Sequence, residues 1–400
     1  MNLTAYKFNR MEVAGSLGDL GTLLPLAIGM ILVNGLKCMG IFITIGLYYI
    51  FSGIYFRVTV PVQPMKVIGA YAIATAMTPN QIAASSILMG LFLFIIGATN
   101  LITVIGTYVP KPVIRGVQLS TGTLLMTQGV KFIMGTSNFQ ALRLQVEPYL
   151  RFQQAAGVPI VVIIGIAAGI LTLFLLENKR FPAGLVIVAS GMLLGLIIGT
   201  HEGLDHTKIG FYLPEILPFG LPASIDFTFA LFALVLPQLP MTLGNAVIAN
   251  ADLSAEYFGA DSNKVTYRAL TISMALANFF SFIVGGMPLC HGAGGLAAHY
   301  RFGARTAGSN LIIGALFLAL AIFLGVNALA IVYLIPMAVL GVLLVFAGSQ
   351  LALTIMDMRE RKDLFVTLLI LGITLASNLA YGFVVGIALS YAIKSDRLKV

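Results

Sequence analysis

Long apolar runs recur along the whole chain, and they constrain the solvent in which it can fold. Residues 160–176 and 181–199 are examples, and each approaches the ~20 apolar residues that a helix needs to cross a bilayer. The chain is 59% hydrophobic and only 10% charged, whereas a soluble chain carries about 25% charged residues. The runs are too continuous for the alternating strands of a membrane barrel. The sequence therefore predicts an all-α membrane protein.

We predict about fourteen transmembrane segments. They cover residues 13–33, 38–56, 58–77, 82–106, 110–130, 156–176, 181–200, 226–249, 265–284, 285–302, 307–326, 328–351, 363–378 and 379–394. The third and tenth contain Pro and Gly where a span should be smooth. Each is therefore expected to break into a short extended piece and a half-helix, which at ~1.5 Å per residue is too short to cross the bilayer alone.

The distribution of basic residues gives the orientation. If the N-terminus lies inside and the spans alternate, only five of the 23 Lys and Arg residues fall outside: Lys37, Lys131, Arg143, Arg151 and Lys208. This is the bias that the positive-inside rule expects, so both termini are predicted to be cytoplasmic. The net charge of +8 then reflects topology and gives no reason to expect nucleic-acid binding. We see no cleavable signal peptide and expect no soluble C-terminal domain.

The two halves of the chain match each other weakly but in the same order. Asp19 aligns with Gln238, Pro64 with Pro288 and Val109-Pro110 with Ile335-Pro336, at nearly one offset. We expect a first repeat at 1–200, an extracellular linker at 201–225 and a second repeat at 226–400. Seven spans per repeat is an odd number, so the second repeat must be inverted in the membrane.

Paired broken spans indicate the substrate site of a transporter. If the two half-helices enter from opposite faces, their N-termini meet at depth, and each carries unpaired N–H groups and roughly +0.5 of an elementary charge. Together with Lys66 they suit a doubly charged oxyanion, and glycines allow it to approach the backbone closely. The candidate binding residues are Thr22, Gln63, Pro64, Met65, Lys66, Gln238, Thr242, Asn245, Cys290, His291, Gly292, Gly294 and Gly295.

Several of these residues have a plainer interpretation. Lys66 is a candidate for the fixed positive charge of the site. Alternatively, its side chain extends to the membrane surface or pairs with Asp19. Asp19 and His291 are candidates for coupling transport to protons. Alternatively, Asp19 is a buried structural partner and His291 a helix cap. Asn245 either contacts the substrate or makes an interhelical hydrogen bond.

No metal or catalytic chemistry is expected. The histidines and carboxylates lack metal-ligand or catalytic-dyad spacing. Cys38 and Cys290 form no disulfide framework. We therefore expect no enzyme activity, no cofactor and no metal.

Four motifs resemble the molybdate transporter family, a relative of the sulfate permeases. They are Gly18-Asp19-Leu20-Gly21-Thr22, Pro61-Val62-Gln63-Pro64-Met65-Lys66, the stretch 236–247 and Met287-Pro288-Leu289-Cys290-His291-Gly292-Ala293-Gly294-Gly295-Leu296. The resemblance implies the seven-plus-seven inverted-repeat fold of uracil permease. Spans 1–4 and 8–11 would form a core domain, and spans 5–7 and 12–14 a gate domain. Dimers are common in that fold. It also implies a location in a bacterial inner (plasma) membrane.

The resemblance further implies high-affinity uptake of molybdate, with sulfate as competitor or alternative. No phosphate-binding loop of the form G-x-x-x-x-G-K-[ST] is present, so we expect no ATPase in the chain itself and a secondary transporter. The resemblance implies that such a transporter works by alternating access, with the core moving against the gate. A sulfate permease, a nucleobase permease of the same fold and a channel are the alternatives. A nucleobase site would favour carboxylates where Gln238 and His291 stand. Molybdate, sulfate and tungstate share one shape, and neither the choice among them nor the coupling ion follows from the sequence.

Overall fold

The computed structural model describes residues 6–99, 101, 109–176, 178 and 181–393. The end of the predicted span 82–106 and both chain termini lie outside the described residues. Elements in the first half are α1 (Arg10–Ser16), α2 (Leu20–Leu32), α3 (Cys38–Phe56), β1 (Gln63–Pro64), α4 (Lys66–Thr75), α5 (Pro79–Thr99), α7 (Lys111–Met134), α8 (Asn138–Arg143), β2 (Gln154–Ala155), β3 (Val158–Pro159), α9 (Ile160–Leu175) and α10 (Ala183–Ile198).

The second half is also mainly helical. Its elements are α11 (Ser224–Phe229), η2 (Ala230–Val235), α12 (Leu236–Met241), η3 (Thr242–Ile248), α13 (Ala249–Phe258), η4 (Gly259–Ser262), α14 (Tyr267–Val284), β4 (Leu289–Cys290), α15 (Ala293–Arg301), α16 (Gly308–Ala319), η5 (Leu320–Leu324), η6 (Gly325–Asn327), α17 (Ala328–Val332), α18 (Met337–Ala352), η7 (Leu353–Asp357), α19 (Arg361–Ala376) and α20 (Leu379–Ile393).

Within the described residues, six helical stretches are long and apolar enough to cross a membrane. A seventh is the pair α1 and α2, which is bent by 42°. Helices α4, α9, α10 and α20 are apolar but shorter. Large apolar side chains are exposed on the outer helices, for example Phe174 at 80%. Such exposure fits a surface that faces lipid, so the chain is an integral membrane protein.

Several predicted spans have different boundaries in the structure. The span 13–33 is the bent pair α1 and α2, 226–249 lies inside the longer stretch Ser224–Ser262, and 307–326 continues to Val332. The segment 328–351 is divided, because α17 ends at Val332 and α18 begins at Met337. The break has a simple cause: Ile335 precedes Pro336, and the residue before a proline avoids helical geometry. Pro336 then starts α18 from the N-cap position.

A continuous helical stretch, Ser224–Ser262, crosses the middle of the second half. It contains π-helical turns at Ala230–Val235 and Thr242–Ile248, on either side of Pro237 and Pro240. A proline inside a helix removes one backbone hydrogen bond, and a widened π turn accommodates the loss. The second π turn carries Thr242 and Asn245, so this irregularity determines the direction in which both side chains point.

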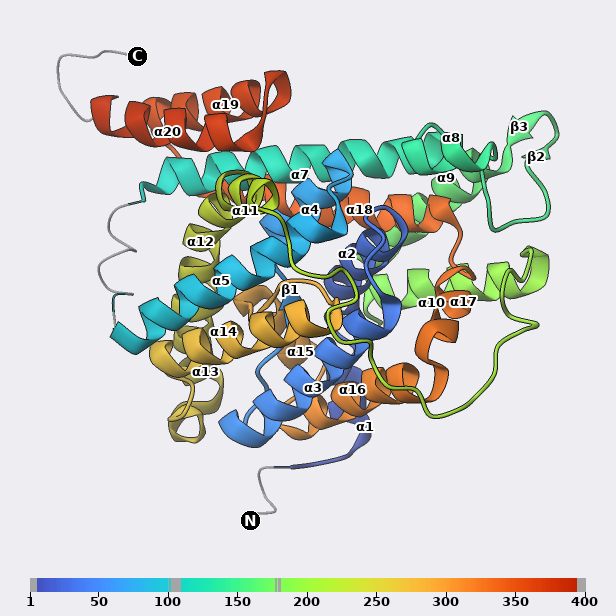
Figure 1. Ribbon diagram of the computed structural model, residues 1–400, viewed down its shortest axis with the longest axis horizontal. Coiled ribbons are helices and arrows are strands. Elements are labelled where there is room, and N and C mark those ends of the chain that lie inside the picture. The colour runs from blue at the N-terminus through green and yellow to red at the C-terminus, as the bar shows by residue number, and fades with distance from the viewer. Residues whose placement is uncertain (1–5, 100, 102–108, 177, 179–180, 394–400) are drawn as a thin grey trace.

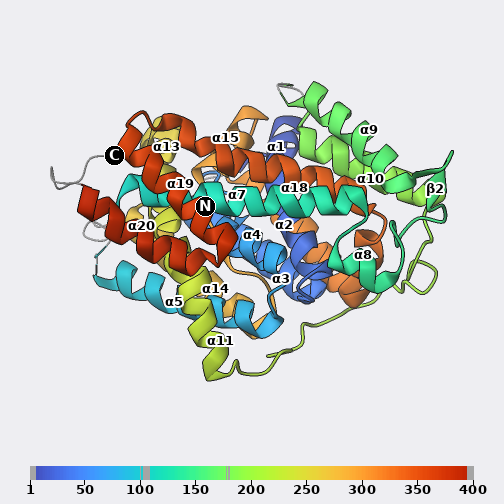
Figure 2. The ribbon, with the colours of Figure 1, turned by 90° about the horizontal axis from the view of Figure 1, so that it is seen from above.

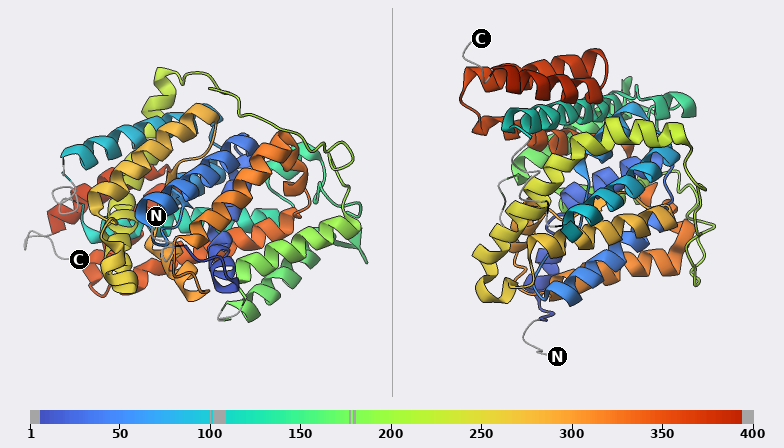
Figure 3. Two further views of the ribbon diagram at one scale, coloured as in Figure 1. Left: turned by 90° about the horizontal axis from the view of Figure 1, so that it is seen from below. Right: turned by 60° about the vertical axis from the view of Figure 1, so that its left-hand side comes forward.

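The helices form two layers. In one layer α5, α14, α3 and α16 lie side by side in that order (Figure 3, left). In the other, α7 packs against α18, α19, α20 and α9, with α10 beside α9 (Figures 1 and 2). Helices α2 and α4 contact the second layer, α2 through α18 and α10 and α4 through α7. We call this second layer, α7, α9, α10 and α18–α20, the α7 layer.

Two short extended segments meet in the interior between the layers (Figure 1). Strand β1 pairs antiparallel with β4, with Gln63 opposite Cys290 and Pro64 opposite Leu289. Buried amide side chains bind the polar backbone on both sides of this crossing. Asn278 bonds both backbone groups of Leu289, and Asn310 bonds both backbone groups of Val60. Irregular backbone at depth is therefore hydrogen-bonded by protein, as a membrane interior requires.

The segment predicted as an extracellular linker, 201–225, is mostly irregular and lies along one side of the molecule (Figure 3, left). Backbone N–H groups of Gly210, Tyr212 and Leu217 donate to Phe323, Ile322 and Ile283. An exposed ion pair of 3.2 Å joins Lys37 to Glu215. These contacts attach the linker to the start of α3, to α14 and to η5.

Candidate functional site

Helices α4 and α15 start on opposite sides of the β1–β4 crossing. Helix α4 begins at Lys66 and α15 at Ala293, each preceded by an extended N-cap residue, Met65 and Gly292. The Met65 N–H donates to the Pro288 carbonyl at 3.0 Å. The β pairing thus holds the two helix N-termini next to each other, although they are far apart in sequence.

The N-terminus of α4 is already occupied by a side chain. The Gln238 Oε1 accepts from the backbone N–H of Val67 at 2.9 Å and of Ile68 at 3.2 Å. Its Nε2 donates to the Thr242 hydroxyl at 2.9 Å. Gln238 and Thr242 are both 1% exposed. Gln238 therefore caps α4, supported by Thr242, and α4 has fewer free N–H groups than the sequence suggests.

The N-terminus of α15 is different. Among the described residues, the N–H groups of Ala293, Gly294 and Gly295 have no hydrogen-bond acceptor. Gly294 is exposed, and a Cβ on it would lie 4.0 Å from the Lys66 Nζ. The ammonium group that begins α4 therefore lies over the free N-terminus of α15. The Lys66 ammonium group and the unpaired N–H groups at the start of α15 therefore lie close together, and such a combination favours the binding of an anion.

A cavity of about 370 Å³ adjoins this place. Helices α2 and α4 and the π turn η3 line one side of it with Thr22, Lys66 and Asn245. The α7 layer and the adjoining η7 line the other side with Gln118, Thr172, Gln350 and Thr354. Among the described residues, the polar lining consists of one ammonium group with hydroxyl and amide groups, and it includes no carboxylate.

Asp19 and Gln63 lie directly behind the first turn of α15. The Gln63 Nε2 donates to the Asp19 Oδ2 at 2.5 Å, and both residues are at most 5% exposed. A Cβ on Gly295 would lie 2.7 Å from each of these two atoms, and a Cβ on Gly292 only 1.9 Å from the Gln63 Oε1. Gly292 and Gly295 therefore let this polar pair pack against α15. Ion pairs among the described residues involve other carboxylates, so Asp19 does not pair directly with Lys66.

His291 is turned away from the cavity. Its Nδ1 bonds the Pro61 carbonyl at 2.8 Å, and its Nε2 bonds the hydroxyls of Tyr48 at 2.8 Å and Ser273 at 2.9 Å. The side chain is completely buried. With both ring nitrogens bonded to other segments, His291 connects β4 to α3 and α14. It does not cap α15, whose N-cap Gly292 has no side-chain hydrogen bond, so the interpretation as a helix cap is wrong. Cys290 is also buried, with its thiol directed at the Pro64 carbonyl at 3.7 Å.

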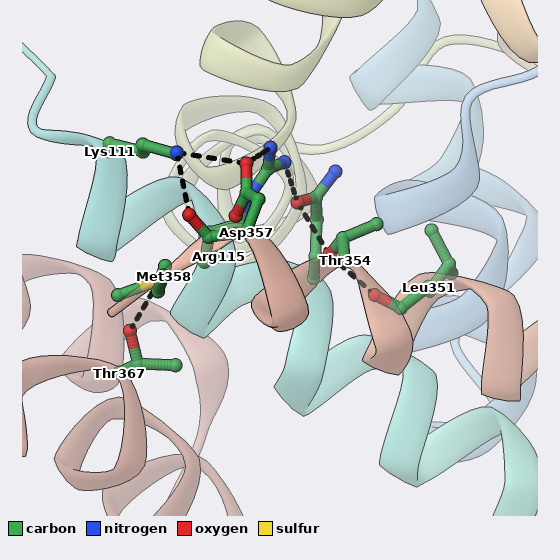
Figure 4. Close-up of polar contacts among 8 residues, drawn as sticks. Lys111, Arg115, Leu351, Thr354, Asp357, Met358 and Thr367 are labelled. Carbon is green, nitrogen blue, oxygen red and sulfur yellow. Dashed lines mark hydrogen bonds and ion pairs between the residues drawn. The ribbon is translucent and has the colours of Figure 1, made fainter. Parts of the chain in front are cut away.

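The far wall of the cavity contains polar residues that the sequence analysis did not select. The Gln118 Oε1 accepts from the Arg115 Nη1 at 2.8 Å and from the Thr354 hydroxyl at 3.0 Å. Arg115 and Lys111 both point to Asp357, at 2.5 and 2.9 Å (Figure 4). Since a guanidinium only donates, the Gln118 oxygen must face Arg115, which leaves its NH₂ group free for the cavity. A glutamine one helical turn after an arginine inside a predicted span was the available signal.

The described residues contain no group of three or more His, Cys, Asp or Glu side chains placed to hold a metal ion. The lining of the cavity offers hydroxyl and amide groups and one lysine ammonium group. It can hold and release an anion without changing covalent bonds.

An integral membrane protein with short helices meeting at a polar interior cavity belongs, by architecture, to the membrane transporters. The comparisons with known proteins agree. Residues 11–125 and 230–351 match the family model described as "Molybdate transporter of MFS superfamily". The chain belongs to this molybdate transporter family.

Two plant relatives match almost the entire chain. Molybdate transporter 2 of Arabidopsis thaliana is 31% identical over 412 residues, which cover 96% of this chain and 87% of the relative. Molybdate transporter 1 of the same plant is 30% identical and covers 94% and 86%. Molybdate transporter 1 of Chlamydomonas reinhardtii is also 30% identical, covering 94% and 90%.

Solved structures give the fold. The anion transporter SLC26A9 superposes with a TM-score of 0.68 at 15% identity, covering 98% of this chain and 66% of that one. The transmembrane domain of the cyanobacterial bicarbonate transporter BicA gives 0.66 at 15% identity and covers 96% and 98%. The fold is therefore of the SLC26 type, although the description of the family names a different superfamily.

Proposed function

We propose that this protein is a secondary transporter that imports molybdate, or a closely similar tetrahedral oxyanion such as sulfate or tungstate, by alternating access. Membership in the molybdate transporter family and the SLC26-type fold support an anion as substrate. The observation that carries the proposal is the approach of the Lys66 ammonium to the unpaired N–H groups at the start of α15. Neutral donors on the cavity wall would complete the shell of a tetrahedral anion and still allow its release.

We further propose specific roles for the site residues. The N–H groups of Ala293, Gly294 and Gly295 and the Lys66 ammonium would bind the anion directly, with Thr22 and Asn245 as neighbouring donors. Gln238 and Thr242 would act indirectly by fixing the start of α4. Pro64, Met65 and Cys290 would hold the β1–β4 crossing, and His291 would anchor it to α3 and α14.

The proposed topology is the fourteen-segment inverted repeat with both termini in the cytoplasm. Support comes from the antiparallel crossing, since β1–α4 and β4–α15 have the same order of elements and meet in opposite directions. The core domain would contain α1–α5 and α11–α16, and the gate domain the α7 layer with α17. Alternating access would then be a movement of one against the other, with the anion carried on the core.

Calorimetric binding of molybdate and sulfate to the purified full-length protein tests the proposal. We expect saturable binding of molybdate, and Lys66→Ala is expected to lower the affinity at least tenfold, because it removes the charged group of the cavity lining. Lys264→Ala, at an exposed position beyond η4, is the matched control and should bind as the wild type does. Absence of binding of either anion to the wild type would exclude the proposed function. Wild-type affinity in Lys66→Ala would place the anion elsewhere.

A further inference from the structure

The amide oxygen of Gln63 is an unusual atom in this structure. It is buried and, among the described residues, has no hydrogen-bond partner. A buried acceptor without a partner destabilises the folded state, because it has lost its hydrogen bond to water. The Gln63 Oε1 and the Asn245 Nδ2 both lie within 3.6 Å of the point that a Cβ on Gly292 would occupy. Because Asn245 lines the cavity, the unpaired oxygen lies next to the proposed anion site.

The ionised form of Asp19 explains this orientation. A carboxylate can only accept hydrogen bonds, so it requires the donor group of the Gln63 amide to face it. The carbonyl oxygen must then point the opposite way, toward Gly292 and Asn245. In this state the amide directs partial negative charge toward the place where an anion would bind, which opposes binding.

Protonation of Asp19 reverses the requirement. A carboxylic acid has an O–H donor, which can bond to the Gln63 oxygen if the amide turns by half a rotation. The NH₂ group of Gln63 then points toward Gly292 and Asn245, where it can donate to an oxyanion. The unpaired acceptor disappears and the site gains a donor in the same step.

We propose that Asp19 and Gln63 form a proton-binding pair that couples one proton to each bound oxyanion by rotation of the Gln63 amide. This inference rests on the proposed function and deepens it, because it names the coupling ion and the device. One proton enters Asp19 from water when the anion binds and leaves when the anion is released. No covalent bond of the anion is made or broken.

The surroundings of Asp19 allow it to act as the proton-binding group. The charged or titratable groups around it are Lys66 of α4, Tyr49 of α3 and Cys290 of β4. His299 of α15 stacks on Tyr49 at 6.1 Å, and among the described residues its ring nitrogens have no partner. An anion that engages the Lys66 ammonium group offsets the positive charge near Asp19, and a proton on the carboxyl group then removes the repulsion between two negative charges.

The test uses calorimetry of molybdate binding to the full-length protein, in pairs of buffers with different ionisation enthalpies, from mildly acidic to mildly alkaline pH. For the wild type we expect proton uptake approaching one per anion, and an affinity that falls about tenfold per pH unit once Asp19 is ionised. Asp19→Asn mimics the protonated acid, because its NH₂ group donates to the Gln63 oxygen. It should bind molybdate without proton uptake and with no dependence on pH.

Asp252→Asn is the matched control, since Asp252 is an exposed carboxylate on α13, and it should keep the wild-type pH dependence. Retention of that dependence in Asp19→Asn would overturn the inference.

If Asp19→Asn does not fold, the variant Gln63→Leu tests the inference in its place, because it leaves Asp19 in position and removes the amide. Weakened binding that no longer depends on pH supports the inference, and an unchanged pH slope overturns it. Replacing sodium by choline should change nothing, and a dependence on sodium in place of protons would also overturn it.

Wild-type binding without proton uptake would refute the coupling alone, because the transporter would then bind its anion by another means. Absence of wild-type binding would refute the proposed function itself. The two failures are therefore distinguishable in the same experiment.

Discussion

At the scale of single residues, the site depends on the absence of a side chain at Gly292, which packs against Gln63. Gly292 has an extended backbone, with φ of −166°, so its conformation is open to any residue. The requirement for glycine is one of space, because a Cβ would fall 1.9 Å from the Gln63 Oε1. Gly292, which the sequence suggests as a contact for the anion, therefore also leaves the space that the Gln63 side chain occupies.

Gly292→Ala should displace the Gln63 amide and lower molybdate affinity by roughly tenfold, with a stability loss of about 1–3 kcal/mol from overpacking. Isothermal calorimetry and thermal unfolding in detergent measure the two effects. Gly244→Ala is the matched control, because among the described residues a Cβ there meets no atom within 4 Å beyond its chain neighbours and its own helix backbone. Equal behaviour of the two variants would show that the packing around Gly292 has no influence on the site.

At the scale of elements, the ends of helices are capped from distant parts of the chain. Gln238 caps α4, and Glu147 caps α18 with both carboxylate oxygens, which accept from the Met337 N–H at 3.0 Å and the Ala338 N–H at 3.2 Å. Glu147 lies in the loop between α8 and β2, outside the spanning helices, and is fully buried. Burial raises the pKa of this carboxyl group to about 7, despite the opposing effect of its backbone hydrogen bonds.

This pKa gives a prediction for stability against pH. The group binds its proton more tightly in the folded state than in the unfolded chain, where the pKa is near 4.5. Its contribution to the free energy of unfolding is therefore complete below about pH 4.5 and is lost as pH rises through about 7. Glu147→Gln should remove this fall, and thermal unfolding across the interval measures it.

Glu202→Gln is the control for Glu147→Gln, since Glu202 is an exposed partner of Arg143 in the same region. It should keep the wild-type pH profile. A Glu147→Gln profile identical to that of the wild type would mean that another group titrates in this interval.

At the scale of the whole molecule, the cavity lies between the α7 layer and the group α2, α4 and η3, and the two sides touch closely at small residues. Gly184 of α10 is one such position, because a Cβ there would lie 2.1 Å from the Gly21 Cα. Gly21 and Thr22 are adjacent on α2, and both line the cavity. This contact between α2 and the α7 layer would have to change if the layers move during transport.

Gly184→Val should hold α2 and α10 apart and slow molybdate uptake into proteoliposomes by roughly tenfold, because the movement is impaired. Equilibrium affinity should change far less, because Lys66 and the start of α15 stay in place. Gly169→Val on α9 should transport normally, because a Cβ there meets no other part of the described chain within 4 Å beyond its neighbours and its own helix backbone. Uptake at the wild-type rate in Gly184→Val would argue against movement at this contact.

Local patterns were sufficient for the class of protein and for several details of its organisation. Hydrophobic length predicts a helical membrane protein, because a span must be apolar and satisfy its own backbone hydrogen bonds. Motif resemblance predicts the family, which the family model and the plant relatives confirm. Pro and Gly positions direct attention to Gln63–Lys66 and to Gly292–Gly295, since these residues interrupt helices wherever they stand.

Only the tertiary structure decided which polar atoms meet. In the structure Gln238 caps the N-terminus of α4, and His291 bonds Tyr48 and Ser273. Gln118 and Thr354 lie across the cavity from Lys66. The physical reason is that a hydrogen bond depends on distances of a few tenths of an ångström between residues far apart in sequence. Periodicity and composition are local properties, so they identify the broken segments, whereas the packing of the layers determines which donors remain free for an anion.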